Sequence, residues 1–153
     1  MIRIDIPERG IIELRHAVFD INGTLAVDGI AMPEVADYLQ QLSDQLSIHI
    51  LTAGTHGNLA RLEKTLGFPL HIITKGEEKM RYVQQLGSAN VVAFGNGAND
   101  SGMLRLAAIG IAVMTPEGVA IRVLQAADIL VYHPIDALNL LLKPKRLIAT
   151  LRS

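Results

Sequence analysis

Apolar residues in this chain come in short runs that alternate with longer segments of mixed polarity. The runs are rich in Ile, Leu, Val and Ala, which is typical of parallel strands covered on both faces. We expect strands at residues 16–20, 46–52, 70–74, 90–94, 109–114 and 128–132. We expect helices at residues 33–45, 56–67, 76–87, 99–108, 116–127 and 134–143. The alternation predicts an α/β fold with a doubly wound, three-layer, Rossmann-like parallel sheet.

Local signals mark several element boundaries. Pro33 and Pro116 stand where the first turn of a helix tolerates proline. Gly67 and Gly87 follow helical segments, where glycine commonly ends a helix. These four residues therefore predict two helix starts and two helix ends.

The N-terminal segment is expected to form a separate small element. Residues 2–7 and 11–15 flank an Arg9–Gly10 turn and predict a hairpin that extends one sheet edge. A chain of 153 residues can bury a sizeable core without disulfides. We therefore expect a single domain over residues 1–153.

Composition excludes several classes of function. The net charge of −1 gives no indication of a nucleic-acid or membrane surface. The chain has no cysteine, so it has no thiolate metal site and no thiol nucleophile. Its start lacks the pattern of a secretory signal, and charges interrupt every apolar run, so we expect a cytoplasmic protein. The histidines are not at metal-ligand spacings, and we interpret them as structural or surface residues: His16, His49, His56, His71 and His133.

Two strand ends carry polar residues into glycine-containing turns. Asp20 closes the apolar run HAVFD before the turn INGT, and residues 91–104 read VVAFGNGANDSGML. Ligands of open α/β sheets bind beyond the carboxyl ends of the strands. A carboxylate there can attack phosphorus and form an aspartyl phosphate. A turn aspartate that caps its own backbone is the alternative interpretation of Asp20.

The two segments resemble motifs one and four of the haloacid dehalogenase superfamily. D-x-x-G-T-L at residues 20–25 and GNGANDSGML at residues 95–104 carry the resemblance, which is strongest to the phosphorylation domain of P-type ATPases. The resemblance implies a Mg²⁺-dependent phosphohydrolase acting through Asp20 on a phosphorylated substrate. Asn22 stands where phosphatases of this superfamily have their general acid and base, which implies slow turnover.

The resemblance also assigns the other site residues. Thr52, with the backbone of Ala53 and Gly54, matches the motif that holds the phosphoryl group. Lys79 matches the lysine that neutralises the phosphate, with Lys75 as its competitor.

The metal site is expected to be weakened. The implied Mg²⁺ ligands are Asp20, the residue 22 carbonyl of Asn22, Asn96 and Asp100, and Asn96 replaces an aspartate of the family. An amide oxygen can bind a hard cation but brings no charge, so we expect low magnesium affinity. Gly97 and Asn99 are the remaining implied ligand-binding residues of motif four.

The spacing of these residues leaves no room for a cap domain. Asp20, Thr52 and Lys79 are separated by enough residues for one helix and one strand in each gap, so residues 26–32 form at most a flap. An uncapped site suits a large phosphoester or a neighbouring subunit as its lid, hence a homo-oligomer. A second hypothesis is a degenerate module that binds a phosphorylated ligand or a protein partner without turnover. A third is phosphoryl transfer to an acceptor other than water.

Overall fold

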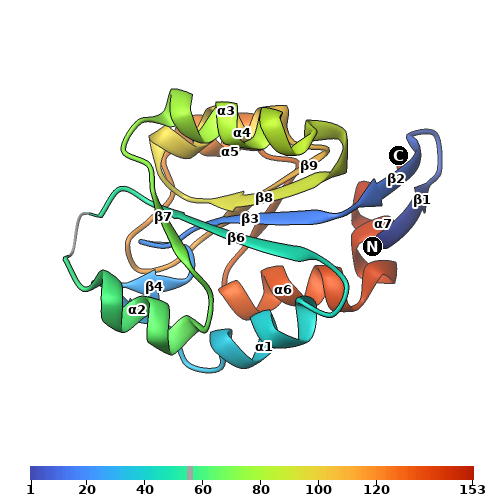
Figure 1. The fold of residues 1–153 in the computed structure, drawn as a ribbon. Coiled ribbons are helices and arrows are strands. Elements are labelled where there is room, and N and C mark those ends of the chain that lie inside the picture. The colour runs from blue at the N-terminus through green and yellow to red at the C-terminus, as the bar shows by residue number, and fades with distance from the viewer. Residues whose placement is uncertain (55–56) are drawn as a thin grey trace.

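The computed structural model describes residues 1–54 and 57–153. Its centre is a parallel sheet with the order β10-β9-β8-β3-β6-β7 (Figure 1). In chain order its strands are β3 (His16–Asp20), β6 (Ser47–Thr52), β7 (Leu70–Ile72), β8 (Val91–Gly95), β9 (Ile109–Val113) and β10 (Ile129–Val131). The first strand of this sheet, β3, is central. The chain then adds β6 and β7 on one side and β8, β9 and β10 on the other, which confirms the doubly wound α/β fold.

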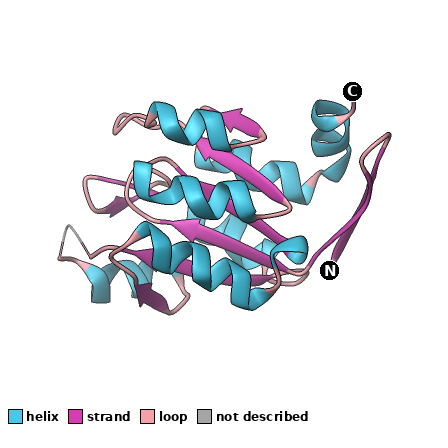
Figure 2. Cartoon of the chain, turned by 90° about the horizontal axis from the view of Figure 1, so that it is seen from above, coloured by secondary structure: helices cyan, strands magenta, loops and turns pink. Residues whose placement is uncertain are grey.

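Helices cover both faces of the sheet. The helices are α1 (Val35–Leu42), α2 (Leu59–Leu66), α3 (Gly76–Leu86), α4 (Ser101–Leu106), α5 (Ile121–Ala126), α6 (Pro134–Leu142) and α7 (Pro144–Leu151), with short 3₁₀ turns η1 (Ser88–Asn90) and η2 (Ala98–Asp100). α3, α4 and α5 cover one face, and α1 and α6 cover the other (Figures 1 and 2). The three predicted layers are therefore present.

Some helix boundaries differ from the sequence prediction. Gly67 and Gly87 do follow helices, each with positive φ, as expected. Pro116 does not begin a helix, because Gly118 at φ +83° forms a turn there, closed by its N–H donating to the Thr115 carbonyl. α5 starts only at Ile121. The helix α7 was not predicted at all.

The N-terminal hairpin forms its own two-stranded sheet. β1 (Ile2–Ile6) pairs antiparallel with β2 (Gly10–Leu14), and the hairpin projects from one end of the molecule (Figure 1). The expectation that it extends a sheet edge was wrong, because β2 runs directly into β3, a central strand. The hairpin instead buries alternate isoleucines of β1 and contacts α7.

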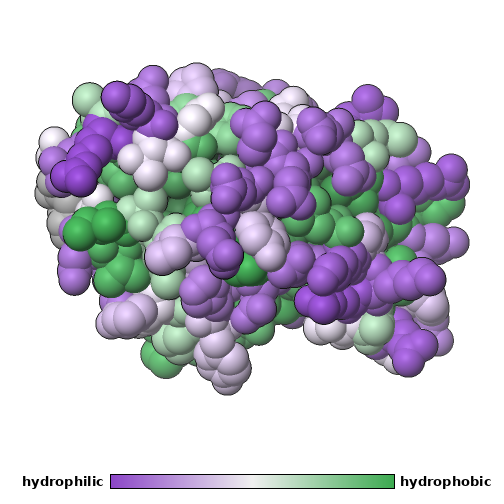
Figure 3. Space-filling model, turned by 90° about the horizontal axis from the view of Figure 1, so that it is seen from below, coloured by the Kyte–Doolittle hydropathy of each residue, from purple (hydrophilic) through white to green (hydrophobic). Residues whose placement is uncertain are grey.

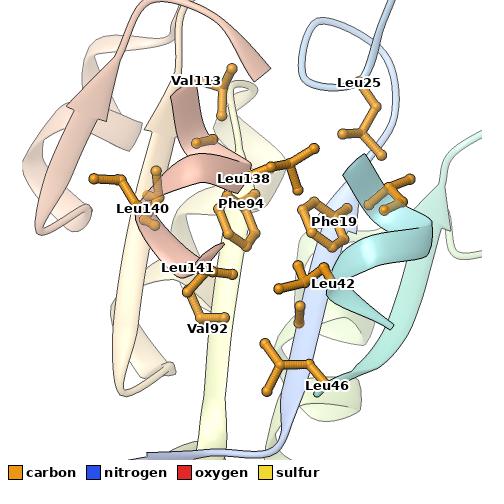
Figure 4. Packing of buried hydrophobic residues seen from close by; sticks show 14 of the residues in the cluster. Phe19, Leu25, Leu42, Leu46, Val92, Phe94, Val113, Leu138, Leu140 and Leu141 are labelled. Carbon is orange, nitrogen blue, oxygen red and sulfur yellow. The ribbon is translucent and has the colours of Figure 1, made fainter. Parts of the chain in front are cut away.

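An aromatic pair fixes the two strands that lead to the polar strand ends. Phe19 of β3 and Phe94 of β8 are register partners, and their rings stack with centroids 4.4 Å apart. Leu42 of α1 and Leu138 of α6 lie around this pair (Figure 4). Because the stacked rings are one residue before Asp20 and Gly95, the core sets the positions of both strand ends.

The segment between β3 and β6 is short. It holds only the flap, a hairpin of β4 (Ala26–Val27) and β5 (Ile30–Ala31), followed by α1. No cap domain is present among the described residues. None of the described helices has the length and apolar character that crossing a bilayer requires. On the face shown in Figure 3, polar residues separate the apolar ones into small areas.

Candidate functional site

Three neighbouring strands place polar residues at their carboxyl ends, on the same side of the molecule. Asp20 is the last residue of β3, Thr52 is the last residue of β6, and Asn96 directly follows β8. β3 pairs in parallel with both β6 and β8, so these three residues leave the sheet side by side. Open α/β sheets bind ligands beyond these carboxyl ends.

Lys79 bridges two carboxylates near these strand ends. From α3 its Nζ donates to Asp20 Oδ1 at 2.8 Å and to Asp100 Oδ1 at 2.7 Å. The lysine side chain is 0 % exposed, as is that of Asp100. Burying an ammonium in a protein costs several kcal/mol unless opposite charges and hydrogen bonds compensate it. Here two carboxylates surround one cation, so the group carries a net negative charge when all three residues are ionised.

Backbone groups hold Asp100 in place. Its Oδ2 accepts hydrogen bonds from the N–H groups of Asn96 and Gly97, both at 3.0 Å. The carboxylate rests against Gly95, where a Cβ atom would lie 2.6 Å from the Asp100 carboxyl group. Glycine at position 95 is therefore required for this packing. With three donors on its two oxygens, Asp100 is a fixed anchor for Lys79.

The charges in this group shift the pKa values of its members. Burial raises the pKa of Asp20 to about 7, and the Asp100 carboxylate acts in the same direction, whereas Lys79 and the N–H of Ile21 oppose both. Burial lowers the pKa of Lys79, but attraction to Asp20 and Asp100 outweighs burial and holds that pKa above its ordinary value. Lys79 therefore stays charged, and Asp20 is the member that exchanges a proton near neutral pH.

The Asn96 side chain connects two loops of the site. Its Oδ1 accepts a hydrogen bond from the Thr24 hydroxyl at 3.2 Å, and its Nδ2 donates to the Gly118 carbonyl at 3.1 Å. The amide lies directly over Gly23, where a Cβ atom would come 2.1 Å from Nδ2. An aspartate at this position could not donate to Gly118, so the asparagine has a structural role that the sequence did not indicate.

Two threonines of the site were missed as functional candidates. Thr24 hydrogen-bonds Asn96 and lies 3.5 Å from Asp20 Oδ2, and Thr115 donates to the Gly23 carbonyl at 3.0 Å. Both were visible in the sequence. Thr24 belongs to the D-x-x-G-T segment, and Thr115 directly follows the strand predicted at residues 109–114, just as Thr52 closes the strand predicted at 46–52.

The remaining predicted residues lie around this group with different degrees of contact. The Oδ1 atom of Asn22 is buried and has no hydrogen-bond partner among the described residues. The Thr52 hydroxyl accepts the N–H of Gly54, which follows Ala53 in the same loop. Asn99 is exposed on η2, and the N–H of its neighbour Gly97 is occupied by Asp100.

The two candidate lysines are clearly distinguished. Lys75 is exposed and stands at the start of α3, whereas Lys79 is buried between the carboxylates. Only Lys79 has an ion pair with the site.

The donor atoms fit a hard cation of modest affinity. The Asp20 carboxylate, Asn96 Oδ1 and the unpartnered Asn22 Oδ1 all offer oxygen, the ligand type that Mg²⁺ prefers. Among residues 1–54 and 57–153, no three His, Cys, Asp or Glu side chains come together in a metal-binding arrangement. The site therefore suits magnesium by ligand type, and its low carboxylate count predicts weak binding.

Comparison with known proteins identifies the family. Residues 31–129 match the family model of haloacid dehalogenase-like hydrolases. The chain belongs to this family. An uncharacterised protein of Methanocaldococcus jannaschii is 38% identical over 78 residues, which are 48% of this chain and 84% of that protein.

Solved structures of haloacid dehalogenase-like hydrolases share the fold. The 3-deoxy-D-manno-octulosonate 8-phosphate phosphatase of Moraxella catarrhalis, solved with magnesium, phosphate and the sugar acid, is 19% identical with a TM-score of 0.68. That match covers 91% of this chain and 94% of the phosphatase. The catalytic domain of the CPx-ATPase CopB-B is 27% identical with a TM-score of 0.58, covering 78% of this chain and 46% of that one. Phosphatases and a P-type pump domain are thus both similar to this chain.

A second polar cluster lies on the same two central strands, away from their carboxyl ends. His16 Nδ1 and His49 Nε2 are 3.2 Å apart, and His49 Nδ1 is 2.9 Å from the Tyr82 hydroxyl. The ring of His71 lies 5.5 Å from that of Tyr82. These residues form the histidine cluster. His56 lies outside the described residues.

Proposed function

We propose that this chain is a Mg²⁺-dependent phosphohydrolase that forms an aspartyl phosphate on Asp20 and turns over slowly. The buried group of Asp20, Lys79 and Asp100 carries the proposal. Well-packed apolar residues often give equal or better stability than buried ion pairs, so stability alone does not account for the group. Buried charges with shifted pKa values at a strand-end crevice are typical of functional sites. The phosphatase named above, solved with magnesium and phosphate, supports the same chemistry.

The two oxygens of Asp20 have different surroundings. Oδ1 is held by Lys79, whereas Oδ2 has only the Thr24 hydroxyl at 3.5 Å. We assign Oδ2 as the atom that attacks phosphorus. Lys79 then offsets the negative charge that the phosphoryl group brings to the carboxylate.

Loops after the strands would hold the phosphoryl group. Because the Thr52 oxygen already accepts the Gly54 N–H, its hydroxyl hydrogen is available to a phosphoryl oxygen. The Ala53 backbone N–H adds a second donor in the same loop. The absent side chain of Gly97 leaves room beside Asn99, whose amide is exposed to a ligand.

Magnesium would be held by Asp20, Asn96 and the backbone carbonyl of Asn22. Asp100, the fourth ligand that the resemblance implies, fits least, because its oxygens accept hydrogen bonds from Lys79 and from two backbone N–H groups. When bound, the metal neutralises charge on the nucleophile and on the phosphoryl oxygens. Asn22 cannot move a proton near neutral pH, and positioned acid–base catalysis is typically worth ~10²–10⁴-fold in rate. The phosphoenzyme therefore hydrolyses slowly.

Incubation with acetyl phosphate, with and without magnesium, tests the proposal. The expected result is a mass increase of one phosphoryl group and slow release of phosphate, both dependent on magnesium and both absent in Asp20→Ala. If wild type gains no mass at millimolar acetyl phosphate and high magnesium, the enzyme proposal is wrong. The alternative of a non-catalytic module that binds a phosphorylated ligand or a partner would then replace it.

The proposal also treats residues 1–153 as one domain. Because no cap covers the crevice in the described residues, we expect a neighbouring subunit to cover it in a homo-oligomer. Light scattering of the purified protein tests this expectation, and a monomer at working concentration contradicts it.

A further inference from the structure

The contacts around Asp20 contain few groups that could protonate a departing group. Asp100 is the only other carboxyl group in its bonded network among the described residues, and it is fully buried. Three donors occupy its oxygens: Lys79 and the N–H groups of Asn96 and Gly97. A carboxylate that is fully buried and whose oxygens are occupied in this way cannot reach a substrate.

Lys79 is equally unsuited to give up a proton. Its ammonium group donates to Asp20 and Asp100 within 2.8 Å and is 0 % exposed. A neutral Lys79 would leave two buried carboxylates without a cation, which is strongly unfavourable in a protein interior. The lysine therefore serves as a fixed charge.

The other polar groups are amides and hydroxyls. Thr24, Asn96 and Thr115 hold the surrounding loops together through the hydrogen bonds given above. Asn22, two residues beyond the nucleophile, has an amide that can donate a hydrogen bond but cannot exchange a proton near neutral pH. Glu117 is a carboxylate outside this network that contacts the flap. It is exposed, and its Oε2 accepts the backbone N–H of Asp28 in the flap.

We infer that the site uses phosphoryl donors whose leaving group departs as a stable, weakly basic anion, namely acyl phosphates and phosphoanhydrides, rather than alkyl phosphomonoesters. This inference rests on the proposed function. An alkoxide is a strong base that needs a proton as its bond to phosphorus breaks, whereas a carboxylate or phosphate anion does not. The described residues supply no such proton.

The proposed transfer is balanced without an acid. Asp20 Oδ2 forms a bond to phosphorus, the bond from phosphorus to the donor oxygen breaks, and the electron pair leaves with that oxygen, as a carboxylate from an acyl phosphate or as a phosphate anion from a phosphoanhydride. The product on Asp20 is itself an acyl phosphate, so donor and phosphoenzyme belong to the same chemical class. Water then attacks phosphorus, Asp20 departs as a carboxylate, and the water proton passes to the phosphate product or to bulk water.

A leaving-group series tests the inference. Rates of phosphoenzyme formation would be measured for acetyl phosphate, pyrophosphate, aryl phosphates of graded leaving-group basicity, and ethyl phosphate. The variants are wild type, Asn22→Asp, Glu117→Gln and Asp20→Asn. We expect the wild-type rate to fall steeply as the leaving group becomes more basic. Asn22→Asp, which adds a carboxyl group, should speed ethyl phosphate by ~10²-fold or more and acetyl phosphate by a much smaller factor.

Each outcome has a definite meaning. A steep wild-type series that Asn22→Asp flattens supports the inference, and the ratio of acetyl phosphate to pyrophosphate rates then separates the two donor classes. A flat wild-type series, or ethyl phosphate rates that depend on Glu117, overturns the inference but leaves the proposed function standing. If no donor labels wild type, or if Asp20→Asn is labelled equally, the proposed function fails together with it.

Discussion

The strands β3 and β6 carry two polar clusters, and their chemistry differs from one end of the strands to the other. At the carboxyl ends, Asp20 and Asp100 form ion pairs with the buried Lys79. Away from these ends, His16 and His49 are neutral rings hydrogen-bonded to each other, and His49 also bonds Tyr82.

The difference shows what the fold demands of each cluster. Within the histidine cluster, His16, His49 and Tyr82 are half-buried and bond one another, and burial lowers the pKa of both His16 and His49, whereas His71 is exposed. Pairing neutral polar groups in this way places them under a helix at little cost in free energy.

The group of Asp20, Lys79 and Asp100 instead keeps an unbalanced charge in a buried position. Such an arrangement is costly and remains useful only when a ligand brings the compensating charge. We therefore expect changes at the carboxyl ends of the strands to alter phosphorylation, and changes at the histidine cluster to alter stability alone.

Replacing Lys79 by Met should have the largest effect. Removal of one partner from a buried ion pair typically costs about 3–5 kcal/mol, and here two carboxylates are left unpaired. Urea unfolding would measure this loss, and phosphoenzyme formation should vanish. Lys75→Met on the same helix is the matched control, and we expect it to change stability by no more than about 0.5 kcal/mol. Equal losses in both variants would contradict the assignment of Lys79.

Replacing Asp20 by Asn should remove phosphorylation and raise stability. The pKa of Asp20 lies above its ordinary value, so the folded state loses stability as pH rises from 3.8 toward about 7. Without this ionisation, the variant should be more stable than wild type at pH 8, on the order of 1–2 kcal/mol. Chemical unfolding at pH 5 and pH 8 would measure the difference. A variant less stable than wild type at both pH values would contradict the idea that the charge is kept for function.

Replacing Asn96 by Asp should tighten magnesium binding and loosen a loop. Two unit charges 4 Å apart attract by roughly 4 kcal/mol at an effective dielectric of 20, so a new carboxylate should strengthen binding of the divalent metal by at least that much before desolvation is subtracted. The lost hydrogen bond to Gly118 should cost about 0.5–1.5 kcal/mol of stability in the metal-free protein. Calorimetric titration and unfolding without magnesium would measure the two effects. Asn99→Asp, which alters an exposed neighbour, should produce neither.

The smallest expected effect comes from His49→Phe. Burial lowers the pKa of His49 from 6.5 to about 4, and the nearby His16 and His71 add to the shift. The unfolded chain therefore binds a proton that the folded chain refuses, so this stability is complete above pH 6.5 and lost on acidification toward pH 4. Allowing for solvent that reaches the ring, we expect about 1–2 kcal/mol.

Unfolding of wild type and His49→Phe between pH 7 and pH 4 isolates that contribution, since the phenyl ring keeps the packing against Tyr82 and does not titrate. Phosphoenzyme formation at pH 7 should be unaffected. A loss of activity in this variant would mean that the two clusters are coupled.

The sequence predicted the sheet and the main site residues for clear physical reasons. Hydrophobic runs located all six strands, and the family motifs located Asp20, Lys79 and Asp100. The choice between Lys79 and Lys75 required the structure, because both lie near the start of one helix and only its rotation decides which lysine is buried.

Contacts between distant segments could not be predicted in the same way. Asn96 was interpreted as a weakened metal ligand, but its bond to Gly118 depends on a turn that replaced the first part of a predicted helix. The contact between His16 and His49 was not predicted, because nothing in their spacing shows that β3 and β6 are neighbours. α7 was missed because its basic start concealed an apolar stripe that includes the buried Leu147.

We expect Asp20, which Lys79 and Asp100 hold in place, to be the residue that a phosphoryl donor labels. The most direct measurement is to label the protein with ³²P-acetyl phosphate in magnesium, quench it in acid, and map the label by peptide sequencing. The account predicts label on the peptide that contains Asp20 and none on the peptide that contains Asp100. Label on another residue, or stable label in Asp20→Asn, would contradict it.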